Sequence, residues 1–202
     1  MEKDAKNKLI EAGEKLFAKK GLAGVSIREL AKAAGTNSAL ISYYFGGKEG
    51  LYEAVLEKQF SPIALVLQGI KEVPMTPTPT EKIIAYAKQV AVVHEKSPFL
   101  IRFIIAEILN PSKCFDPIIR KYIQRVYLFL HGTLEEGIHS GEFRRDLNPS
   151  SAVISLAGIM NFYFISRPIF QTFAPVDSRH KELYVMDAVK IFLNGVKENG
   201  CE

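Results

Sequence analysis

The chain has 202 residues, 48% of them hydrophobic and 24% charged, and a formal net charge of +4. This balance indicates a globular protein with an apolar core and excludes a wholly disordered chain. The most apolar run, residues 152–165, is shorter than the roughly twenty residues that a membrane span needs, and the polar N-terminus has no signal-peptide core, so we expect a soluble cytoplasmic protein.

Helical periodicity runs through the whole chain, and no segment alternates apolar and polar residues over the length of a strand. Proline and glycine lie at boundaries; residues 73–81 contain three prolines, which must end any helix before them. The sequence therefore predicts an all-α fold of about nine helices, spanning residues 4–20, 26–34, 37–45, 48–72, 80–96, 98–109, 116–139, 149–172 and 178–198.

The first three helices are short and closely spaced. Residues 1–50 contain nine Lys or Arg against six Asp or Glu, which suggests an anionic partner for this part of the chain. Ser26–Glu29 form a capping box at the start of the second helix. That helix ends at Gly35, and Asn37 is suited to cap the third. A helix, a tight turn with glycine and a second short helix is the helix-turn-helix arrangement.

The third helix has two distinct faces at about 100° per residue. Ile41 and Phe45 point together toward the core, with Tyr44 near that edge. The opposite face is centred on Ala39 and Tyr43, and it carries no charge. In a helix-turn-helix the second helix enters the major groove of DNA, so this face is the predicted contact surface.

Several residue types at fixed spacing resemble the DNA-binding signature of the tetracycline-repressor (TetR) family of bacterial transcription regulators. The signature covers roughly residues 5–60, and the chain length and helix count also fit the family. The residues that carry the resemblance are Ser26-Ile27-Arg28-Glu29-Leu30-Ala31, Ala34-Gly35, Tyr43, Phe45 and Lys48-Glu49-Gly50-Leu51.

The resemblance implies roles for individual side chains at a DNA operator. Ser26 would bond a backbone phosphate, Arg28 would reach DNA nearby, and Tyr43 would pack on the sugar-phosphate backbone. Lys48, at the start of the fourth helix, would bind phosphate, which helix N-termini favour. Positions from which family members touch bases or phosphates are occupied by Thr36, Asn37, Ser38, Ala39, Leu40, Ser42 and Tyr44.

The sequence departs from the common family pattern in the third helix. Leu40 stands where the family usually has Thr, which suggests apolar contact with a thymine methyl group. Ser42 stands where it often has Tyr. The helix has no Arg, Lys or Gln for bidentate base contacts, so we expect specificity to rest on Arg28, small hydroxyls, methyl contacts and DNA shape. The alternative is that Tyr43 and Tyr44 are core residues and Lys48 is an ordinary solvated lysine.

The resemblance also implies a division of the chain. Residues 1–47 would be the DNA-binding domain, helix 48–72 a connector, and 73–202 an effector-binding and dimerisation domain. Helix 149–172 is apolar around nearly its whole circumference, and helix 178–198 has a broad apolar face, so the pair predicts a four-helix homodimer interface. Burial within one protomer is the competing interpretation. The predicted interface residues are Ala157, Met160, Met186, Val189 and Leu193.

The helices between residues 80 and 172 are rich in aromatic and aliphatic side chains. An apolar pocket with a few polar groups would suit a small, largely apolar effector. The predicted lining residues are Phe103, Glu107, Tyr122, Val126, Asn161 and Phe164. Polar side chains such as Glu107 and Asn161 are more often surface or core-bonded residues than ligand contacts, and the sequence does not identify the effector.

No motif indicates an enzyme. The four histidines share no metal spacing, and no phosphate-binding glycine loop or local nucleophile set occurs, so we expect no catalytic residue, no metal and no cofactor. Cys114 and Cys201 match no metal or redox spacing. The sequence therefore predicts a homodimeric transcriptional repressor released by an effector. The alternative is a helical-bundle interaction module or a small-molecule-binding protein without DNA binding.

Overall fold

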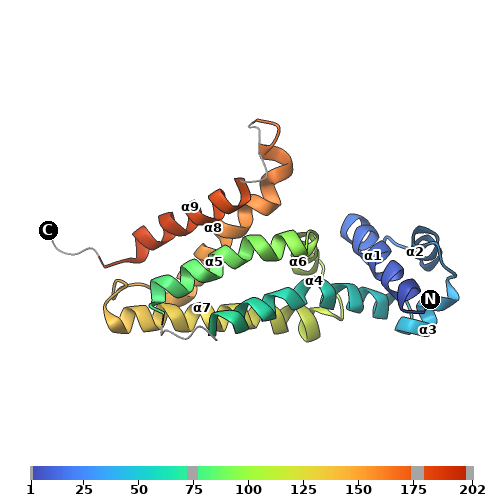
Figure 1. The fold of residues 1–202 in the computed structure, drawn as a ribbon, viewed down its shortest axis with the longest axis horizontal. Helices are drawn as coiled ribbons and strands as arrows, with labels where there is room; N and C mark the ends of the chain where they lie inside the picture. Colours follow the sequence, from blue (N-terminus) through green and yellow to red (C-terminus); the bar gives the residue numbers. More distant parts are fainter. Residues whose placement is uncertain (1, 72–76, 174–179, 199–202) are drawn as a thin grey trace. The chain divides into compact units, whose positions relative to one another are not determined.

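The computed structural model describes residues 2–71, 77–173 and 180–198, and it confirms the all-α prediction (Figure 1). In the described segments the helices are joined by turns, and the one β-type pairing is an isolated bridge between Phe143 and Lys197. The elements are α1 (Glu2–Lys20), α2 (Ile27–Ala34), α3 (Ala39–Phe45), α4 (Lys48–Lys71), α5 (Pro79–Lys96), α6 (Leu100–Leu109), the π-helical turn η1 (Phe115–Arg120), α7 (Lys121–Ser140), α8 (Pro149–Phe170) and α9 (His180–Val196).

The largest departure from the predicted helices lies at residues 116–139. One helix was predicted there, whereas the structure has the π-helical turn η1 followed by α7. Pro117 lies within the turn and lacks the N–H that a regular α-helical bond would use. Much of the predicted proline break at 73–81 lies outside the described residues.

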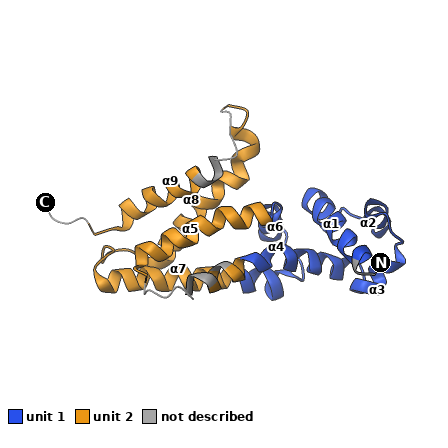
Figure 2. Cartoon of the chain, in the orientation of Figure 1, with its two compact units in different colours: residues 1–62, 97–122 blue, residues 63–96, 123–202 orange. Residues whose placement is uncertain are grey.

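The chain packs as two compact units (Figure 2). Unit 1 comprises residues 1–62 and 97–122, and unit 2 comprises residues 63–96 and 123–202. Packing therefore groups α6 and η1 with the N-terminal helices. The functional division into residues 1–47, a connector at 48–72 and residues 73–202 concerns a different property and stays a prediction.

The core of unit 1 is built on one face of α4. Tyr52, on this face, is 2% exposed and meets the ring of Phe17 from α1 at 5.1 Å between centroids. The same ring meets Phe103 from α6 at 6.0 Å, again edge to face. Such pairs add about 0.5–1.5 kcal/mol each beyond the area they bury. One aromatic residue of α4 thus joins α1 and α6.

A set of buried hydrogen bonds also joins α1 and the start of α6 to α4, about two turns further along α4. The Gln59 amide donates to the Glu14 carboxylate of α1 at 2.6 Å, and its oxygen accepts from the backbone N–H of Phe99 at 3.3 Å. Lys58 also donates to Glu14, at 2.9 Å. Glu14 is 8% exposed, so these donors replace the water that the carboxylate loses on folding.

A second buried carboxylate lies on the α6 side of α4. Glu107 is 2% exposed and accepts three hydrogen bonds: from the Tyr52 hydroxyl at 2.7 Å, and from the Ser112 backbone N–H at 2.9 Å and hydroxyl at 3.0 Å. The pKa of Tyr52 is raised well above its usual value, first by burial and then by the bond to Glu107. Three donors in a low-dielectric site stabilise a carboxylate without a cation.

In unit 2, α5, α7, α8 and α9 surround a single hydrophobic core. Its fully buried members include Ile83 of α5, Leu130 of α7, Leu156 of α8 and Val189 of α9. Each helix contributes residues at three- and four-residue spacing, as amphipathic helices do. The core thus fixes four helices around one apolar centre.

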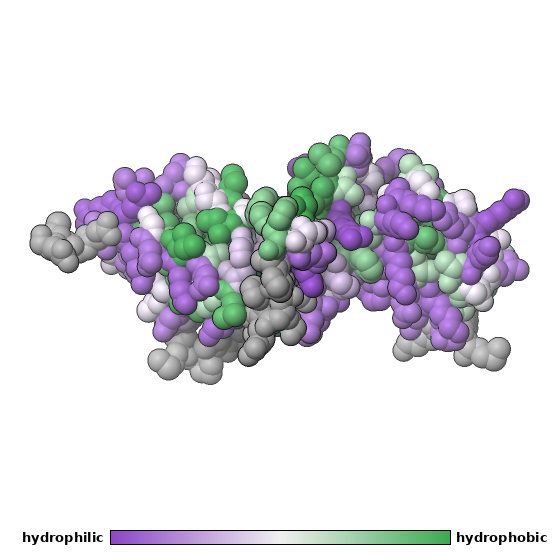
Figure 3. Space-filling view, turned by 90° about the horizontal axis from the view of Figure 1, so that it is seen from above, coloured by the Kyte–Doolittle hydropathy of each residue, from purple (hydrophilic) through white to green (hydrophobic). Residues whose placement is uncertain are grey.

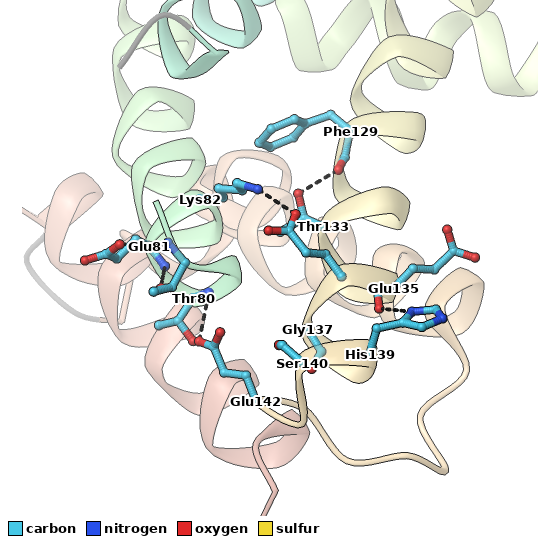
Figure 4. A network of polar contacts seen from close by, with 12 residues as sticks. Thr80, Glu81, Lys82, Phe129, Thr133, Glu135, Gly137, His139, Ser140 and Glu142 are labelled. Atoms are coloured by element: carbon cyan, nitrogen blue, oxygen red, sulfur yellow. Dashed lines mark hydrogen bonds and ion pairs between the residues drawn. The ribbon is translucent and has the colours of Figure 1, made fainter. Parts of the chain in front are cut away.

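Polar contacts fix the N-terminal end of α5 against the end of α7 (Figure 4). Thr78 and Glu81 cap α5 reciprocally, each side chain accepting the other residue's backbone N–H. The Glu142 carboxylate accepts from the Thr80 backbone N–H at 3.1 Å, and Lys82 forms an ion pair with Glu136. The backbone N–H groups in the first turn of α5, which have no partner within the helix, therefore find acceptors inside unit 2.

By length and composition alone, α8 could cross a membrane. This differs from the sequence-based expectation, which considered the shorter run 152–165. One such helix is weak evidence for a membrane span; 22% of its apolar window is buried, and α8 contributes Leu156 and Met160 to the core. The predicted kink or stop at Pro168 falls near the helix end, since α8 continues to Phe170.

The bond from Tyr52 to Glu107 generates a prediction about stability. Tyr52→Phe removes one donor to a buried carboxylate and should lower the free energy of unfolding at pH 7 by about 1.5–3 kcal/mol. The raised pKa in the folded state means that the tyrosine proton is held more tightly there than in the unfolded chain. Its contribution is therefore complete below the ordinary tyrosine pKa of 10.0 and is lost as the pH rises above it.

Urea unfolding at pH 7 and above pH 10 checks both parts. The wild-type protein should lose stability above pH 10 more steeply than Tyr52→Phe. Combining Tyr52→Phe with Glu107→Gln should cost less than the sum of the single changes, because the first removes this bond and the second weakens it by removing the charge of the acceptor. Additive costs, or parallel pH dependences, would contradict the role given to this contact.

Candidate nucleic-acid interface

Helix α2 begins at a capping box. The Ser26 hydroxyl accepts from the Glu29 backbone N–H at 3.2 Å, as the sequence predicts. The Glu29 carboxylate forms an ion pair with Lys20 at the end of α1. The pKa of Glu29 is lowered chiefly by that lysine, with a smaller contribution from the backbone N–H of Ser26. The start of α2 is therefore fixed both by its own cap and by α1.

The turn between α2 and α3 needs glycine at Gly35, where φ is +61°. The Gly35 and Thr36 backbone N–H groups close the end of α2 by donating to carbonyls of its last turn. The Asn37 side-chain oxygen then accepts from the Ala39 N–H at 2.9 Å. This bond holds the first residue of α3. The helix begins at Ala39, two residues later than predicted.

Helix α3 has the two faces that its sequence predicts. Ile41 is fully buried, whereas Tyr43 is 72% exposed, with Ala39 and Ser42 also exposed. Tyr44 is half-buried between its neighbours, with ring centroids 5.0 Å from Tyr43 and 6.2 Å from Phe45. Tyr44 can thus support the helix with its ring and still present an edge at the surface. The exposed face carries no charged side chain.

Two cations of the N-terminal helices are engaged within the chain. Lys20 pairs with Glu29, and the Lys48 ammonium donates to the Val25 backbone carbonyl at 3.1 Å. Lys6 lies 5.7 Å from the centre of the Phe45 ring. Arg28 is exposed on α2. Sequence reasoning missed the contact between Lys48 and Val25, because 23 residues separate the two and no local pattern links them.

The predicted DNA-contacting residues lie in unit 1 on α2, α3, the turns beside them and the first residue of α4. The Thr36 hydroxyl does not fit the prediction of a DNA contact, because its oxygen is buried and has no hydrogen-bond partner in the structure. The exposed members are Ser26, Arg28, Asn37, Ala39, Ser42 and Tyr43, and the half-buried members are Thr36, Ser38, Leu40, Tyr44 and Lys48.

The six predicted pocket residues fall into two groups, one in each unit. Phe103, Glu107 and Tyr122 are buried in unit 1, where each contacts a residue of α4. In unit 2, Asn161 and Phe164 both contact His94, whose ring stacks on Phe164 at 3.7 Å between centroids. Val126 is half-buried against the core of the same unit. His94 was not predicted, since nothing in its neighbouring sequence distinguishes it.

Three of the five predicted dimer residues lie inside the protomer. Met160 and Val189 are fully buried and Leu193 is 5% exposed, all in the core of unit 2. Ala157 and Met186 are half-buried. Most of the apolar face predicted for α9 therefore packs within its own chain, whereas Leu183 of that face is exposed. The apolar residues that α8 and α9 expose are Ile154, Phe162, Ile165, Ile169, Phe170, Leu183 and Ile191.

Two family models match the chain. Bacterial regulatory proteins of the tetR family match residues 9–55, and the tetracyclin repressor-like C-terminal domain matches residues 79–186. The chain is 29% identical over 143 residues to the probable HTH-type transcriptional regulator YttP of Bacillus subtilis, covering 71% of this chain and 69% of YttP.

Solved structures share the fold. The ketosteroid transcriptional regulator KstR2 of Mycobacterium tuberculosis superposes with a TM-score of 0.73 and 19% identity, covering 96% of this chain and 95% of KstR2. FadR of Bacillus subtilis, crystallised with stearoyl-CoA, superposes with a TM-score of 0.72 and 19% identity, covering 93% and 97%.

The cap at Ser26 generates a prediction that does not involve a ligand. Ser26→Ala removes the acceptor for the Glu29 N–H and should lower the free energy of unfolding by about 1 kcal/mol. Ser26→Asp retains an acceptor at the same position and adds negative charge at a helix N-terminus, so its stability should stay near that of the wild type. Thermal unfolding followed by circular dichroism measures both, and equal losses for the two variants would contradict the capping role.

Proposed function

The chain belongs to the TetR family of bacterial regulatory proteins, which are DNA-binding transcription regulators, and we propose that it is a homodimeric repressor that a small, largely apolar effector releases from its operator. The observation that carries the DNA-binding part is the exposed, uncharged face of α3 beside the capped start of α2. We propose a cytoplasmic protein without catalytic activity, in line with relatives named as transcription regulators.

The proposed phosphate contact at Ser26 fits the hydrogen bonds that this hydroxyl already makes. Its oxygen accepts from the Glu29 N–H, which leaves its own O–H as a donor for a phosphate oxygen. Asn37 is in a similar position, because its oxygen accepts from Ala39 and its NH2 group retains two donors. Arg28 supplies an exposed positive charge next to Ser26. These groups position α3 on the duplex.

The face of α3 itself is proposed to read base edges in the major groove. Ala39 lets the helix approach closely, Leu40 can meet a thymine methyl group, and Ser42 can bond either kind of base edge. A surface without charges loses little hydration when it enters the groove, while phosphate attraction comes from residues around it. Tyr43 and Tyr44 are proposed to pack against the sugar-phosphate backbone, with the Tyr44 ring half-buried.

The proposed dimer uses the outward side of α8. Ile154, Gly158, Phe162, Ile165 and Ile169 follow one another at three- or four-residue spacing and are all exposed. Figure 3 displays apolar side chains, drawn green, at the molecular surface among purple hydrophilic ones. A helix stripe of this kind suits isologous packing against the same stripe of a second copy. A dimer also meets the need for two recognition helices about one DNA turn apart.

An apolar effector is supported by the composition of the two predicted groups. Phe103 and Tyr122 lie in one group, whose carboxylate Glu107 is already bonded within the core, and Val126 and Phe164 lie with Asn161 in the other. The related fold of FadR holds stearoyl-CoA, a molecule with a long acyl chain. We propose that an effector of largely apolar character biases the protein toward a state with lower DNA affinity.

Selection of binding sites from random double-stranded DNA tests the proposed function. The wild-type protein should enrich a two-fold symmetric site, with an affinity that falls steeply as salt rises. Ser26→Asp should keep the fold but lose most of this binding, because a carboxylate would face the proposed phosphate. The absence of any enriched site, or of duplex binding, would favour a helical-bundle interaction module or a small-molecule-binding protein without DNA binding.

Gly158 offers a direct test of the dimer. A Cβ at Gly158 or at Gly132 of α7 would meet no atom within 4 Å in the protomer, so both glycines accept a larger side chain. Gly158→Leu should weaken the dimer about 30-fold or more, because leucine would keep two α8 helices from approaching closely. Sedimentation equilibrium should then report the 22.6 kDa monomer, whereas Gly132→Leu should stay dimeric. Dimers in both variants would contradict the α8 interface.

A further inference from the structure

Helix α4 has a proline well inside it. Pro62 lies between the ends of the helix at Lys48 and Lys71. Proline has no backbone N–H, so the helical bond to the Lys58 carbonyl cannot form, and the proline ring crowds the same carbonyl. The Ser61 hydroxyl donates to that carbonyl at 3.4 Å, a long bond that replaces the missing one only weakly. The backbone hydrogen bonds of α4 are therefore interrupted at this turn.

The turn of α4 just before the proline, residues 57–60, is held firmly by the rest of unit 1. The Glu57 carboxylate accepts from the Tyr122 hydroxyl, at the end of the second segment of the unit. The Gln59 side chain is 2% exposed, and its oxygen accepts from the backbone N–H of Phe99, near the start of that segment. One turn of α4 thus holds both ends of the second segment of unit 1.

The chain leaves or enters unit 1 at three places. Unit 1 ends at Pro62, resumes at Ser97 and ends again at Tyr122; Figure 2 shows the change of unit part of the way along α4. Phe99 lies two residues after the second of these places, and Tyr122 is the third itself. The bonds made by residues 57–60 therefore gather all three boundaries of unit 1 around one turn of α4.

The two parts of α4 bury their apolar side chains in different units. Phe60, before the proline, is fully buried in unit 1, whereas Ile63 and Leu67, after it, are buried in unit 2. Sharp bends in helices occur almost always at proline, and alanine at such a position would give a more stable helix. A sequence that breaks a local rule at one position often does so for function. The place where Pro62 stands is the place where a bend would matter most.

We propose that α4 bends at Pro62 and that this bend is the pivot about which the DNA-binding helices move when the effector releases the operator. The contacts of residues 57–60 keep the first part of α4 in one body with α1, α6 and η1, so a change of angle costs least at the interrupted turn that follows. The inference rests on the proposed function, because it specifies where the DNA-binding and released states differ.

Amide hydrogen exchange tests the pivot in the free protein, without DNA or effector. Pro62→Ala supplies the N–H that the Lys58 carbonyl lacks. The amides of Ile63 and Ala64 should then exchange at least about fivefold more slowly than in the wild type, measured relative to the amides of α1. Pro149→Ala is the matched control, because Pro149 is the first residue of α8, where no helical bond is missing. It should leave these rates unchanged.

The pivot would be overturned by equal exchange rates at Ile63 and Ala64 in the wild type and Pro62→Ala. A slowing of the same size in the amides of α1 would overturn it as well, because it would mean that the substitution stabilises the whole protein and not this turn.

Operators with altered spacing test what the pivot does for DNA binding. The probes are the duplex enriched in the selection experiment and two variants with one base pair inserted or removed at its centre. Half-site spacing has to match the separation of the recognition helices, so a dimer whose α4 helices bend should tolerate both variants better than one with stiffened helices. Relative to its own best duplex, the wild type should lose roughly tenfold in affinity and Pro62→Ala roughly a hundredfold. Pro149→Ala should behave as the wild type.

Equal tolerance of altered spacing in the wild type and Pro62→Ala would overturn the pivot even if exchange at Ile63 slowed. If the wild-type protein bound no duplex at all, the proposed function would fail, and the pivot would lose its role in DNA release with it. The exchange experiment would then still decide whether α4 is interrupted at Pro62, so the two failures are distinguishable.

Discussion

The structure of unit 1 depends on one requirement: a single face of α4 must satisfy two buried carboxylates. Glu14 comes from α1 and Glu107 from α6, and neither has enough water left to stay solvated. Gln59 and Tyr52 of α4 donate to them. Because an unpaired buried carboxylate costs several kcal/mol by order of magnitude, α1 and α6 are held to fixed positions along α4. Apolar packing alone would tolerate small shifts, whereas these hydrogen bonds do not.

The proposed recognition surface on α3 carries no charge and also depends on fixed positioning. The exposed face of α3 contributes no ionic attraction to a partner, so its orientation has to be set by the residues around it. Ile41 fixes the buried side, Asn37 fixes the start of the helix, and the cap at Ser26 fixes α2. Lys20 pairs with Glu29, and Lys48 donates one hydrogen bond to the Val25 carbonyl, so contacts inside the protein orient both lysines.

Local signals in the sequence were sufficient for most of the fold and for the two faces of α3. The capping box at Ser26, the end of α2 at Gly35 and the helical period of α3 are each determined within a few residues, and each was predicted. The contacts that the sequence could not give join distant residues, as Lys48 joins Val25 and Tyr52 joins Glu107. A buried threonine hydroxyl at residue 36 was missed for the same reason, since its burial depends on how the turn packs.

The predicted dimer residues illustrate a deeper limit of sequence patterns. A helical apolar face looks the same whether it packs on its own chain or on a second copy, so Met160 and Val189 could not be assigned from spacing. The structure assigns them to the core, which leaves the outward apolar stripe on α8 without an occupant in the protomer. In the proposed dimer, one apolar face of α8 serves the core and the other packs on a second copy. Such a division would account for the composition that made α8 resemble a membrane span.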